Sequence, residues 1–308
     1  MSHTPVMINE SIESMIKNKN GCYIDGTLGG GGHLKEILKK IDDNGLVIGF
    51  DRDFEAIRRV QKIEKKDPRF KSVHSNFTEI SKKLDELGIK KVDGVFLDLG
   101  VSSYQIDNPE RGFSFSKNGP LDMRMDQSQE MCARKWINIA GEEEIANTIY
   151  KYGNENMSKK IAHAIVEFRK DKKIETTKQL ADLILKVKNN GKYKKIHPAT
   201  KSFQAIRIKI NNELENLENV LSEMINKICI GGRFVILTFH SLEDRIVKHF
   251  FNSHVKRKDS LQEGGYKING LQPYIKWISK NVIIPSRDEI VKNPRSRSAK
   301  LRVIEIVG

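Results

Sequence analysis

Two acids and the glycine-rich segment between them are the residues of this chain best suited to chemistry. Asp25 ends the apolar run 22–25 and directly precedes Gly26–His33, and Asp51 ends the next apolar run, 46–51. Glycine lets the backbone approach a ligand where a Cβ would clash. An acid at the end of the second strand can accept hydrogen bonds from two ribose hydroxyls. This order predicts a site for a nucleoside cofactor.

The spacing of the glycines narrows the type of nucleoside. The dinucleotide fingerprint needs glycine at its first, third and sixth positions, and no frame through Gly26–Gly32 satisfies it. The P-loop pattern also fails, because no Gly-Lys-Ser/Thr follows. Asp25 fits a cofactor with a cationic amino-acid end better than a polyphosphate. We therefore predict S-adenosylmethionine; a tight strand–helix turn without a ligand is the alternative.

A second polar segment follows the apolar run that ends at Asp98. It contains Ser102, Ser103 and Gln105. Amine methyltransferases need an acceptor for the target amino group, and many use an Asp/Asn-Pro-Pro-aromatic turn that is absent here. Asp98 and Ser102 are the candidate replacements, and in-line positioning would supply most of the rate acceleration. A turn or helix-capping role is the alternative for Asp98.

A third segment, 238–245, also follows an apolar run. His240 is a candidate substrate contact, although a lone histidine is more often structural. Ser241 and Asp244 have the spacing of a helix cap. No Ser-His-acid set or metal-ligand pattern stands out, so no metal is expected.

The elements that must position these residues alternate between strand and helix in the first hundred residues, which predicts a parallel sheet with helices on both faces. The expected strands are 22–25, 46–51, 71–74 and 92–99, with helical stripes at Ala56–Ile63 and Ile80–Leu87 between them. The next convincing strand, 233–239, comes much later, and 301–306 forms a last one.

The long interval before 233–239 exceeds a single crossover of ~30 residues, and its apolar residues have helical spacing. We therefore expect residues 108–210 to form an inserted helical substrate-recognition domain. Residues 1–107 and 211–308 then form the sheet domain, with a helix over 214–228. Ligands bind beyond the carboxyl ends of the strands in such sheets, where four segments converge: Gly26–His33, Asp51, Asp98–Ser103 and His240–Asp244.

Composition points to a globular protein that handles a polyanion. Hydrophobic residues make up 38% of 308 residues, and no apolar run approaches the ~20 residues of a membrane span. The first residues lack a signal peptide's pattern, and three widely spaced cysteines suit a reducing compartment. We expect a cytoplasmic protein with no membrane partner.

Lysine and arginine exceed the acids by 54 to 40. A lysine-rich proteome would explain such an excess as well as a nucleic-acid partner would. Basic residues gather in 186–195, 256–258 and 295–302, and in 293–300 arginine alternates with serine, which suits phosphate contacts. A solvated basic segment is the alternative.

Taken together, ten motifs resemble the bacterial 16S ribosomal RNA cytosine-N4 methyltransferases. The resemblance covers essentially the whole chain. The motifs are His3–Met7, Asp25–His33, Asp51–Asp53, Asp98–Gln105, Arg111–Phe115, Pro120–Asp126, His197–Lys201, Phe203–Ala205, Phe239–Arg245 and Asn293–Arg302.

The resemblance implies a class I methyltransferase fold with an inserted helical domain. It implies S-adenosylmethionine as donor, and a decoding-centre cytidine of 16S ribosomal RNA, free or in the small subunit, as acceptor. The family's cofactor contacts fall on Gly31, Gly32, His33, Asp51, Phe77, Asp98 and Gln105. Our candidates for RNA binding are Lys194, Lys195, Lys201, Arg295, Arg297 and Lys300. Lys201 stands where the family usually has arginine, which weakens a bidentate phosphate contact.

Three other functions compete with RNA methylation. A DNA amine methyltransferase shares the core but usually carries the Pro-Pro turn. A nicotinamide-dependent dehydrogenase is disfavoured by the glycine spacing. A non-catalytic basic RNA-binding protein would explain the charge alone. The oligomeric state is open between a monomer and a homodimer.

Overall fold

The computed structural model describes residues 5–188, 197–255, 257–260, 266–279 and 281–308. The chain forms two compact units. Unit 1 comprises Met1–Gly100 and Leu214–Gly308, and unit 2 comprises Val101–Glu213. The boundaries expected from the sequence lie after residues 107 and 210, which would place Gln105 in the sheet domain. The short helix that contains Gln105 belongs to unit 2 instead.

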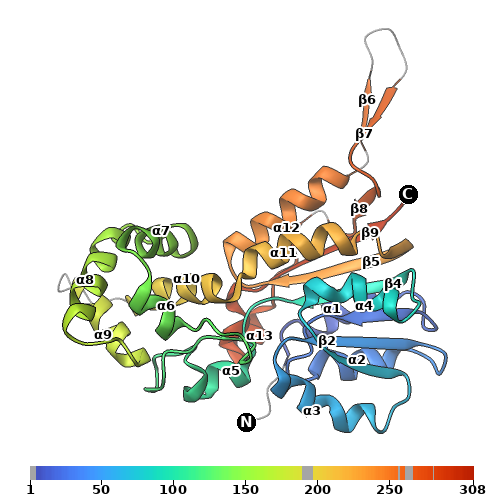
Figure 1. Ribbon diagram of the computed structural model, residues 1–308. Coiled ribbons are helices and arrows are strands. Elements are labelled where there is room, and N and C mark those ends of the chain that lie inside the picture. The colour runs from blue at the N-terminus through green and yellow to red at the C-terminus, as the bar shows by residue number, and fades with distance from the viewer. Residues whose placement is uncertain (1–4, 189–196, 256, 261–265, 280) are drawn as a thin grey trace. The chain divides into compact units, whose positions relative to one another are not determined.

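A seven-stranded sheet forms the centre of unit 1 (Figure 1). From β3 to β5 all neighbouring strands are parallel, and β9 runs antiparallel to both β5 and β8. This mostly parallel sheet confirms the predicted class I methyltransferase fold. In spatial order the strands are β3 (Phe70–His74), β2 (Leu46–Asp51), β1 (Cys22–Asp25), β4 (Val92–Asp98), β5 (Ile228–Thr238), β9 (Lys300–Ile306) and β8 (Ile275–Trp277).

Both faces of the sheet are buried, which explains why its strands are continuous apolar runs. In β4, Val95 and Leu97 enter one core while Phe96 enters the other. In β1, Ile24 enters the first of these cores and Tyr23 enters the second. Successive side chains of a strand point to opposite faces, so one apolar run fills two cores.

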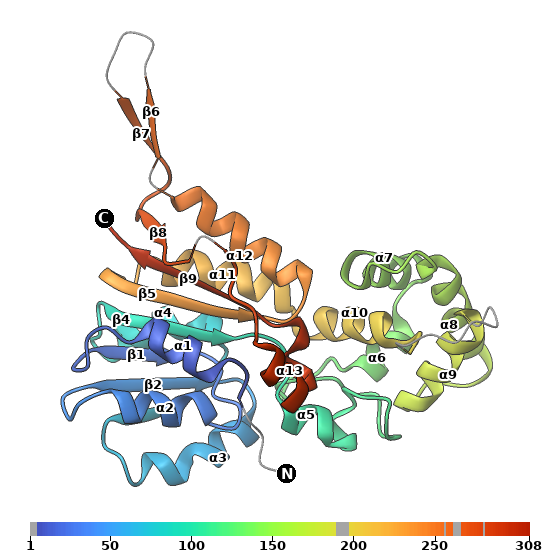
Figure 2. The ribbon, with the colours of Figure 1, turned by 180° about the vertical axis from the view of Figure 1, so that it is seen from behind.

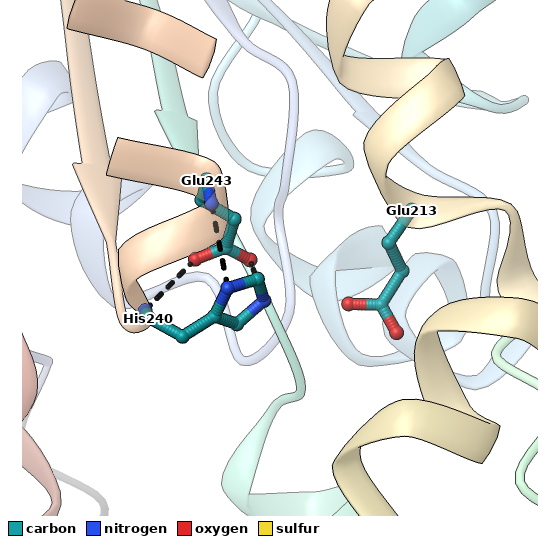
Figure 3. A group of neighbouring side chains, drawn as sticks. All are labelled: Glu213, His240 and Glu243. Carbon is teal, nitrogen blue, oxygen red and sulfur yellow. Dashed lines mark hydrogen bonds and ion pairs between the residues drawn. The ribbon is translucent and has the colours of Figure 1, made fainter. Parts of the chain in front are cut away.

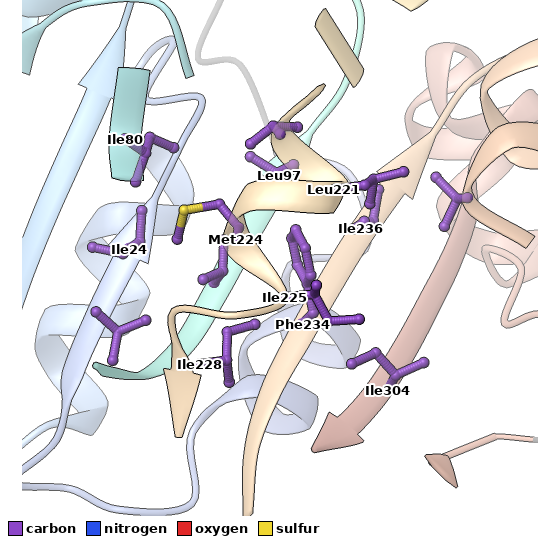
Figure 4. Close-up of a cluster of buried hydrophobic side chains, with 14 of the residues drawn as sticks. Ile24, Ile80, Leu97, Leu221, Met224, Ile225, Ile228, Phe234, Ile236 and Ile304 are labelled. Atoms are coloured by element: carbon purple, nitrogen blue, oxygen red, sulfur yellow. The ribbon is translucent and has the colours of Figure 1, made fainter. Parts of the chain in front are cut away.

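Helices cover the two faces (Figures 1 and 2). One core includes residues of α4 (Ile80–Glu86), α11 (Glu213–Met224) and α12 (Ser241–His254); Figure 4 shows part of it, with Leu97, Leu221 and Phe234. The other core includes residues of α1 (Ile8–Met15), α2 (Gly32–Lys40) and α3 (Phe54–Glu64). The prediction of helices on both faces is confirmed.

The helix predicted over 214–228 is too long. α11 ends at Met224, and Ile228 already pairs with Val92 as the first residue of β5. The register of β5 against β4 shifts between Val92 and Gly94, and Gly231 has a φ of 82°. Such an irregularity takes up extra residues within a strand, so Gly231 and Gly232 lie inside β5.

Unit 2 is helical and has its own core. Apolar side chains at helical spacing, among them Ile145, Ile161, Leu180 and Phe203, pack together there. Its elements are α5 (Ser103–Asp107), η2 (Pro109–Arg111), α6 (Ala133–Ile139), α7 (Glu142–Gly153), α8 (Ser158–Asp171), α9 (Thr177–Lys188) and α10 (Thr200–Asn211).

Several short elements complete unit 1. They are η1 (Phe77–Glu79), the antiparallel pair β6 (Arg257–Ser260) and β7 (Tyr266–Asn269), α13 (Arg287–Lys292) and η3 (Pro294–Ser298). The polar composition of residues 259–267, with Gly264 and Gly265, predicts a loop. The described residues of this segment instead belong to the hairpin of β6 and β7. No helix among the described residues is long and apolar enough to cross a membrane.

Candidate cofactor and active site

The strand order of unit 1 brings three acids to one edge of the sheet. From β1 the chain continues to β2 and β3 on one side and then returns to β4 on the other. Ligands of open α/β sheets bind at such a reversal, beyond the carboxyl ends of the strands. Asp25, Asp51 and Asp98 are the last residues of β1, β2 and β4.

The glycine-rich loop connects β1 to α2 through backbone conformations that few other residues adopt. Gly29 and Gly31 have φ values of 50° and 73°, which favour glycine. A Cβ on Gly31 would lie 2.9 Å from Val60 Cγ1, and a Cβ on Gly32 would clash with the Pro5 ring. At Gly31 and Gly32 the protein's own packing therefore requires glycine, whether or not a ligand approaches them.

Asp51 joins the loop to β2. Each of its carboxylate oxygens accepts one backbone N–H, from Gly29 and from Asp53, both at 2.8 Å. Burial nevertheless raises the pKa of Asp51 to about 6. A carboxylate oxygen has a second lone pair, so Asp51 can still accept hydrogen bonds from ribose hydroxyls.

Asp25 is fully buried and Asp98 is partly buried, and the surroundings of both disfavour ionisation. Burial raises the pKa of Asp98 to about 8, with the charges of Asp25 and Glu243 adding to it. Burial also raises the pKa of Asp25 to about 7. Its Oδ1 accepts the Thr27 N–H at 3.1 Å, whereas its buried Oδ2 has no partner among the described residues. An unpaired buried acceptor and nearby acids fit a ligand with a cationic end, as in S-adenosylmethionine.

His33 lies beside Asp98 in the first turn of α2. Its Nδ1 is 3.7 Å from Asp98 Oδ2, and its Nε2 is 3.1 Å from the Val6 carbonyl oxygen. The ring packs against Phe96 with centroids 4.5 Å apart and is 6% exposed. Backbone and ring contacts thus fix the imidazole next to the acid.

Two residues near this edge were not identified from residue types. Phe77 begins η1, three residues after β3 ends, and packs partly against the core; only the family resemblance pointed to it. An aromatic just beyond a strand end was the available signal. Thr27 was missed altogether: its hydroxyl accepts the Asp98 N–H at 2.7 Å and so connects the ends of β1 and β4.

Ser102 and Gln105 form a capping box in unit 2. The Ser102 hydroxyl accepts the Gln105 N–H at 3.3 Å, and Gln105 Oε1 accepts the Ser102 N–H at 3.0 Å. Gln105 is only 5% exposed. Both side chains therefore help to begin α5, a structural role that exists independently of any contact with ligand.

His240 caps α12 together with Glu243 (Figure 3). Glu243 Oε2 accepts the N–H groups of Phe239 and His240 at 2.8 and 3.2 Å, and His240 Nδ1 accepts the Glu243 N–H at 3.4 Å. The predicted cap of Ser241 and Asp244 is therefore wrong by one residue. Glu213, also drawn, pairs with Arg207 in unit 2.

Asp244 instead holds β9 to α12. Its carboxylate accepts from Lys300 Nζ at 2.9 Å and from Arg302 Nε at 2.6 Å. Lys300, a candidate for RNA binding, thus forms an ion pair with Asp244 within the protein. Lys300 also pairs with Thr238 at the end of β5, so β9 begins at the edge of the sheet that carries the three acids.

The other basic candidates differ in their surroundings. Arg295 and Arg297 are exposed on η3, directly before β9 and therefore at the same edge. In unit 2, Lys201 Nζ donates to the Asn154 carbonyl oxygen at 3.0 Å, at the end of α7. Lys194 and Lys195 lie outside the described residues.

Comparison with known proteins identifies the family. The pattern of the MraW methylase family matches residues 1–307. A protein of Halothermothrix orenii named ribosomal RNA small subunit methyltransferase H is 44% identical over 308 residues, covering 100% of this chain and 99% of that protein. Proteins of the same name from Clostridioides difficile and Clostridium botulinum are each 45% identical, covering 98% of this chain and 98% and 97% of those proteins. This chain belongs to the MraW methylase family, and its cofactor is S-adenosylmethionine.

Proposed function

We propose that this protein methylates the exocyclic N4 amine of a cytidine in the decoding centre of 16S ribosomal RNA. The names of its relatives support ribosomal RNA of the small subunit as the substrate. The motif resemblance supports the cytidine, its N4 amine and the decoding centre. A ribosomal substrate agrees with a cytoplasmic location.

One observation carries this proposal: at the same edge of unit 1, buried acids lie beside an exposed basic segment. Asp25 and Asp98 lie where strand order predicts a cofactor, and their raised pKa values favour the protonated form in the free protein, so a cationic ligand would stabilise their ionised form. Arg295 and Arg297 supply positive charge next to it. A cationic donor and an anionic nucleic acid would thus each meet the opposite charge.

The roles of the cofactor residues follow from their positions. Asp51 would accept hydrogen bonds from the ribose, and Phe77 would pack on the adenine. Asp98 would serve the cationic end of the cofactor, next to His33. The remaining contacts implied by the family are Gly31, Gly32 and Gln105. When bound, S-adenosylmethionine supplies an electrophilic methyl group, so the protein's main task is alignment.

The cytosine amine is a weak nucleophile and needs activation as well as alignment. The lone pair of the cytosine amine is delocalised into the ring, and an acceptor for one amino hydrogen would favour a pyramidal nitrogen. With Asp98 assigned to the cofactor, Ser102 or a backbone carbonyl would orient the amine, and His240 would contact the substrate. The cytidine must also leave its stack to reach the pocket.

We assign RNA binding to two parts of the chain. The exposed arginines of η3 would contact phosphates near the reacting base. The helical unit 2 would contact other parts of the RNA, with Lys201 as a candidate and with Lys194 and Lys195 in the segment outside the described residues. Phosphate contacts of this kind position a nucleic acid without reading its sequence.

The direct test is transfer of labelled methyl from S-adenosylmethionine to purified small subunits, to free 16S RNA and to DNA, followed by nucleoside analysis. We expect label in N4-methylated cytidine of 16S RNA. The Asp51→Ala variant, assayed at a limiting cofactor concentration, provides the low-activity control. Label in DNA alone would favour the DNA amine methyltransferase, and label in another nucleoside would contradict the N4 assignment.

A further inference from the structure

Residues 5–7 lie directly against the glycine-rich loop. The Pro5 ring occupies the space that a Cβ on Gly32 would need. The next residue, Val6, presents its carbonyl oxygen to His33 Nε2 at 3.1 Å. Val6 and Met7 are both buried in the core beneath α1 and α2. We call Pro5–Met7 the N-terminal strap.

A distant helix anchors this strap. The Met7 N–H donates to Glu289 Oε1 at 2.8 Å, across 282 positions of sequence. Met7 has φ 48° and ψ 42°, the left-handed region, although it is not glycine. A residue keeps such a conformation only when its surroundings hold it there. Glu289 is itself fixed, since its N–H donates to the Ser286 hydroxyl that caps α13.

The strap in turn fixes the tautomer of His33. A backbone carbonyl only accepts hydrogen bonds, so the Val6 contact requires the proton on Nε2. In the neutral ring Nδ1 is then the acceptor, and it faces Asp98 Oδ2 at 3.7 Å. Burial raises the pKa of Asp98, so its protonated carboxyl can face this acceptor without repulsion.

We propose that Glu289 is a positioning residue for the cofactor site. It holds the N-terminal strap against the glycine-rich loop, so that the Val6 carbonyl orients His33 Nδ1 toward Asp98. The inference rests on the proposed role of Asp98 in cofactor binding and is independent of the RNA substrate. It assigns a function to a side chain that lies outside the sequence motifs of the family resemblance.

The test compares three variants of the full-length protein. Glu289→Ala removes the acceptor, Glu289→Gln keeps an oxygen for the Met7 N–H, and Asp288→Ala removes an exposed acid from the same first turn of α13. The readouts are the ¹⁵N shifts of His33 without cofactor, and the dissociation constant of S-adenosylmethionine by calorimetry. Turnover at saturating cofactor is measured separately.

We expect Glu289→Ala to give a mixed His33 tautomer and about tenfold weaker cofactor binding, the equivalent of one missing hydrogen bond, with turnover at saturation nearly unchanged. Glu289→Gln should restore both readouts, and Asp288→Ala should match wild type. Unchanged His33 shifts and affinity in a folded Glu289→Ala protein would overturn the inference.

A second variant covers the case in which Glu289→Ala does not fold. Pro5→Gly loosens the strap without touching α13, and it should shift the His33 tautomer and weaken cofactor binding in the same direction. Normal His33 shifts in Pro5→Gly would contradict the proposal. If wild type itself failed to bind S-adenosylmethionine, the cofactor site would be in error rather than the strap.

Discussion

Buried carboxylates at the two edges of the seven-stranded sheet have opposite surroundings. Glu305 lies near the end of β9, at the edge where β5 begins, and is 6% exposed. Burial alone would raise its pKa, but hydrogen bonds from Lys276, Lys17 and Arg233 lower the pKa to about 2. At the other edge, no lysine or arginine among the described residues forms an ion pair with Asp25 or Asp98.

The difference separates charges that stabilise the fold from charges kept for a ligand. A buried acid with cationic partners holds strands together, as Glu305 does for β5, β8 and β9. A buried acid without them destabilises the ligand-free protein and is tolerated where ligand binding offsets the cost. The lack of a lysine or arginine partner at Asp25 and Asp98 therefore supports the proposed cofactor site independently of any sequence motif.

The largest effect is expected at Glu305, the buried carboxylate that has cationic partners. Glu305→Ala leaves Arg233 partly buried without its partner and should lower the free energy of unfolding by about 3 kcal/mol. Because the native pKa is depressed, the wild-type advantage is present above the ordinary pKa of 4.5 and disappears as pH falls toward 2. Urea titrations at several pH values measure this.

Glu36→Ala is the matched control for Glu305→Ala. It breaks an exposed ion pair with Lys39 and should change stability by about 0.5 kcal/mol or less. Equal destabilisation of the two variants would show that burial of Glu305 does not matter.

Asp51 lies at the end of the sheet that carries the three acids. Asp51→Ala should weaken S-adenosylmethionine binding by about 2–3 kcal/mol, because it removes a charged acceptor for two ribose hydroxyls. Asp51→Asn keeps one acceptor oxygen and should weaken binding less. Calorimetry at pH 8, well above the pKa of about 6, gives both values. An unchanged affinity in Asp51→Ala would remove this residue from the ribose site.

Asp98→Asn should stabilise the cofactor-free protein by about 1–3 kcal/mol at pH 8, since one unit of pKa shift corresponds to about 1.4 kcal/mol and 27% side-chain exposure reduces the effect. The native pKa lies above the unfolded one, so wild type loses stability as pH rises from about 4 to 8. The difference between the proteins should grow over that range in thermal unfolding.

The same variant separates two roles of Asp98. If it serves the cofactor, as we propose, affinity should fall in step with the single-turnover rate. If it acts on the amine, the rate should fall while S-adenosylmethionine binds nearly normally. A binding isotherm measured beside single-turnover rates at saturating cofactor distinguishes them, and a variant normal in both would exclude either role.

The smallest effect is expected on RNA binding, from the basic segment η3. Reversing Arg295 and Arg297 to Glu should weaken RNA binding and reduce its salt slope by about 0.7–0.9 for each phosphate that the protein no longer neutralises, without changing cofactor affinity. Reversing Lys65 and Lys66, exposed residues just beyond the end of α3, is the control. An unchanged salt slope in the arginine variant would mean that the arginines of η3 contact solvent and not RNA phosphates.

The sequence predicted the parts of the fold that depend on local pattern. The strands β1, β2 and β4 are apolar on both faces, so their runs stand out, and the acids at their ends follow directly. β8, which has three residues, and the hairpin of β6 and β7 were not predicted, because such short strands carry no periodic signal. β5 begins before the predicted start at residue 233, because its first residues, 228–232, are not a continuous apolar run.

Contacts between distant parts of the chain were beyond sequence reasoning, because local patterns do not record them. Glycine at positions 31 and 32 looked like space for a ligand, yet Val60 and Pro5 fill the space next to them. The hydrogen bond between Glu289 and Met7 joins residues 282 positions apart. Residue types alone give no sign of either interaction.

The placement of β5 and β9 late in the chain has a consequence for synthesis on the ribosome. β4 lies between β1 and β5, so one of its edges stays unpaired until residues 228–238 emerge. Translation of the intervening residues, about 130, takes about 10 s at ~5–20 residues per second. An unpaired apolar strand is a template for aggregation. The nascent chain should therefore need protection, by a chaperone or by its own helical unit, before the sheet can close.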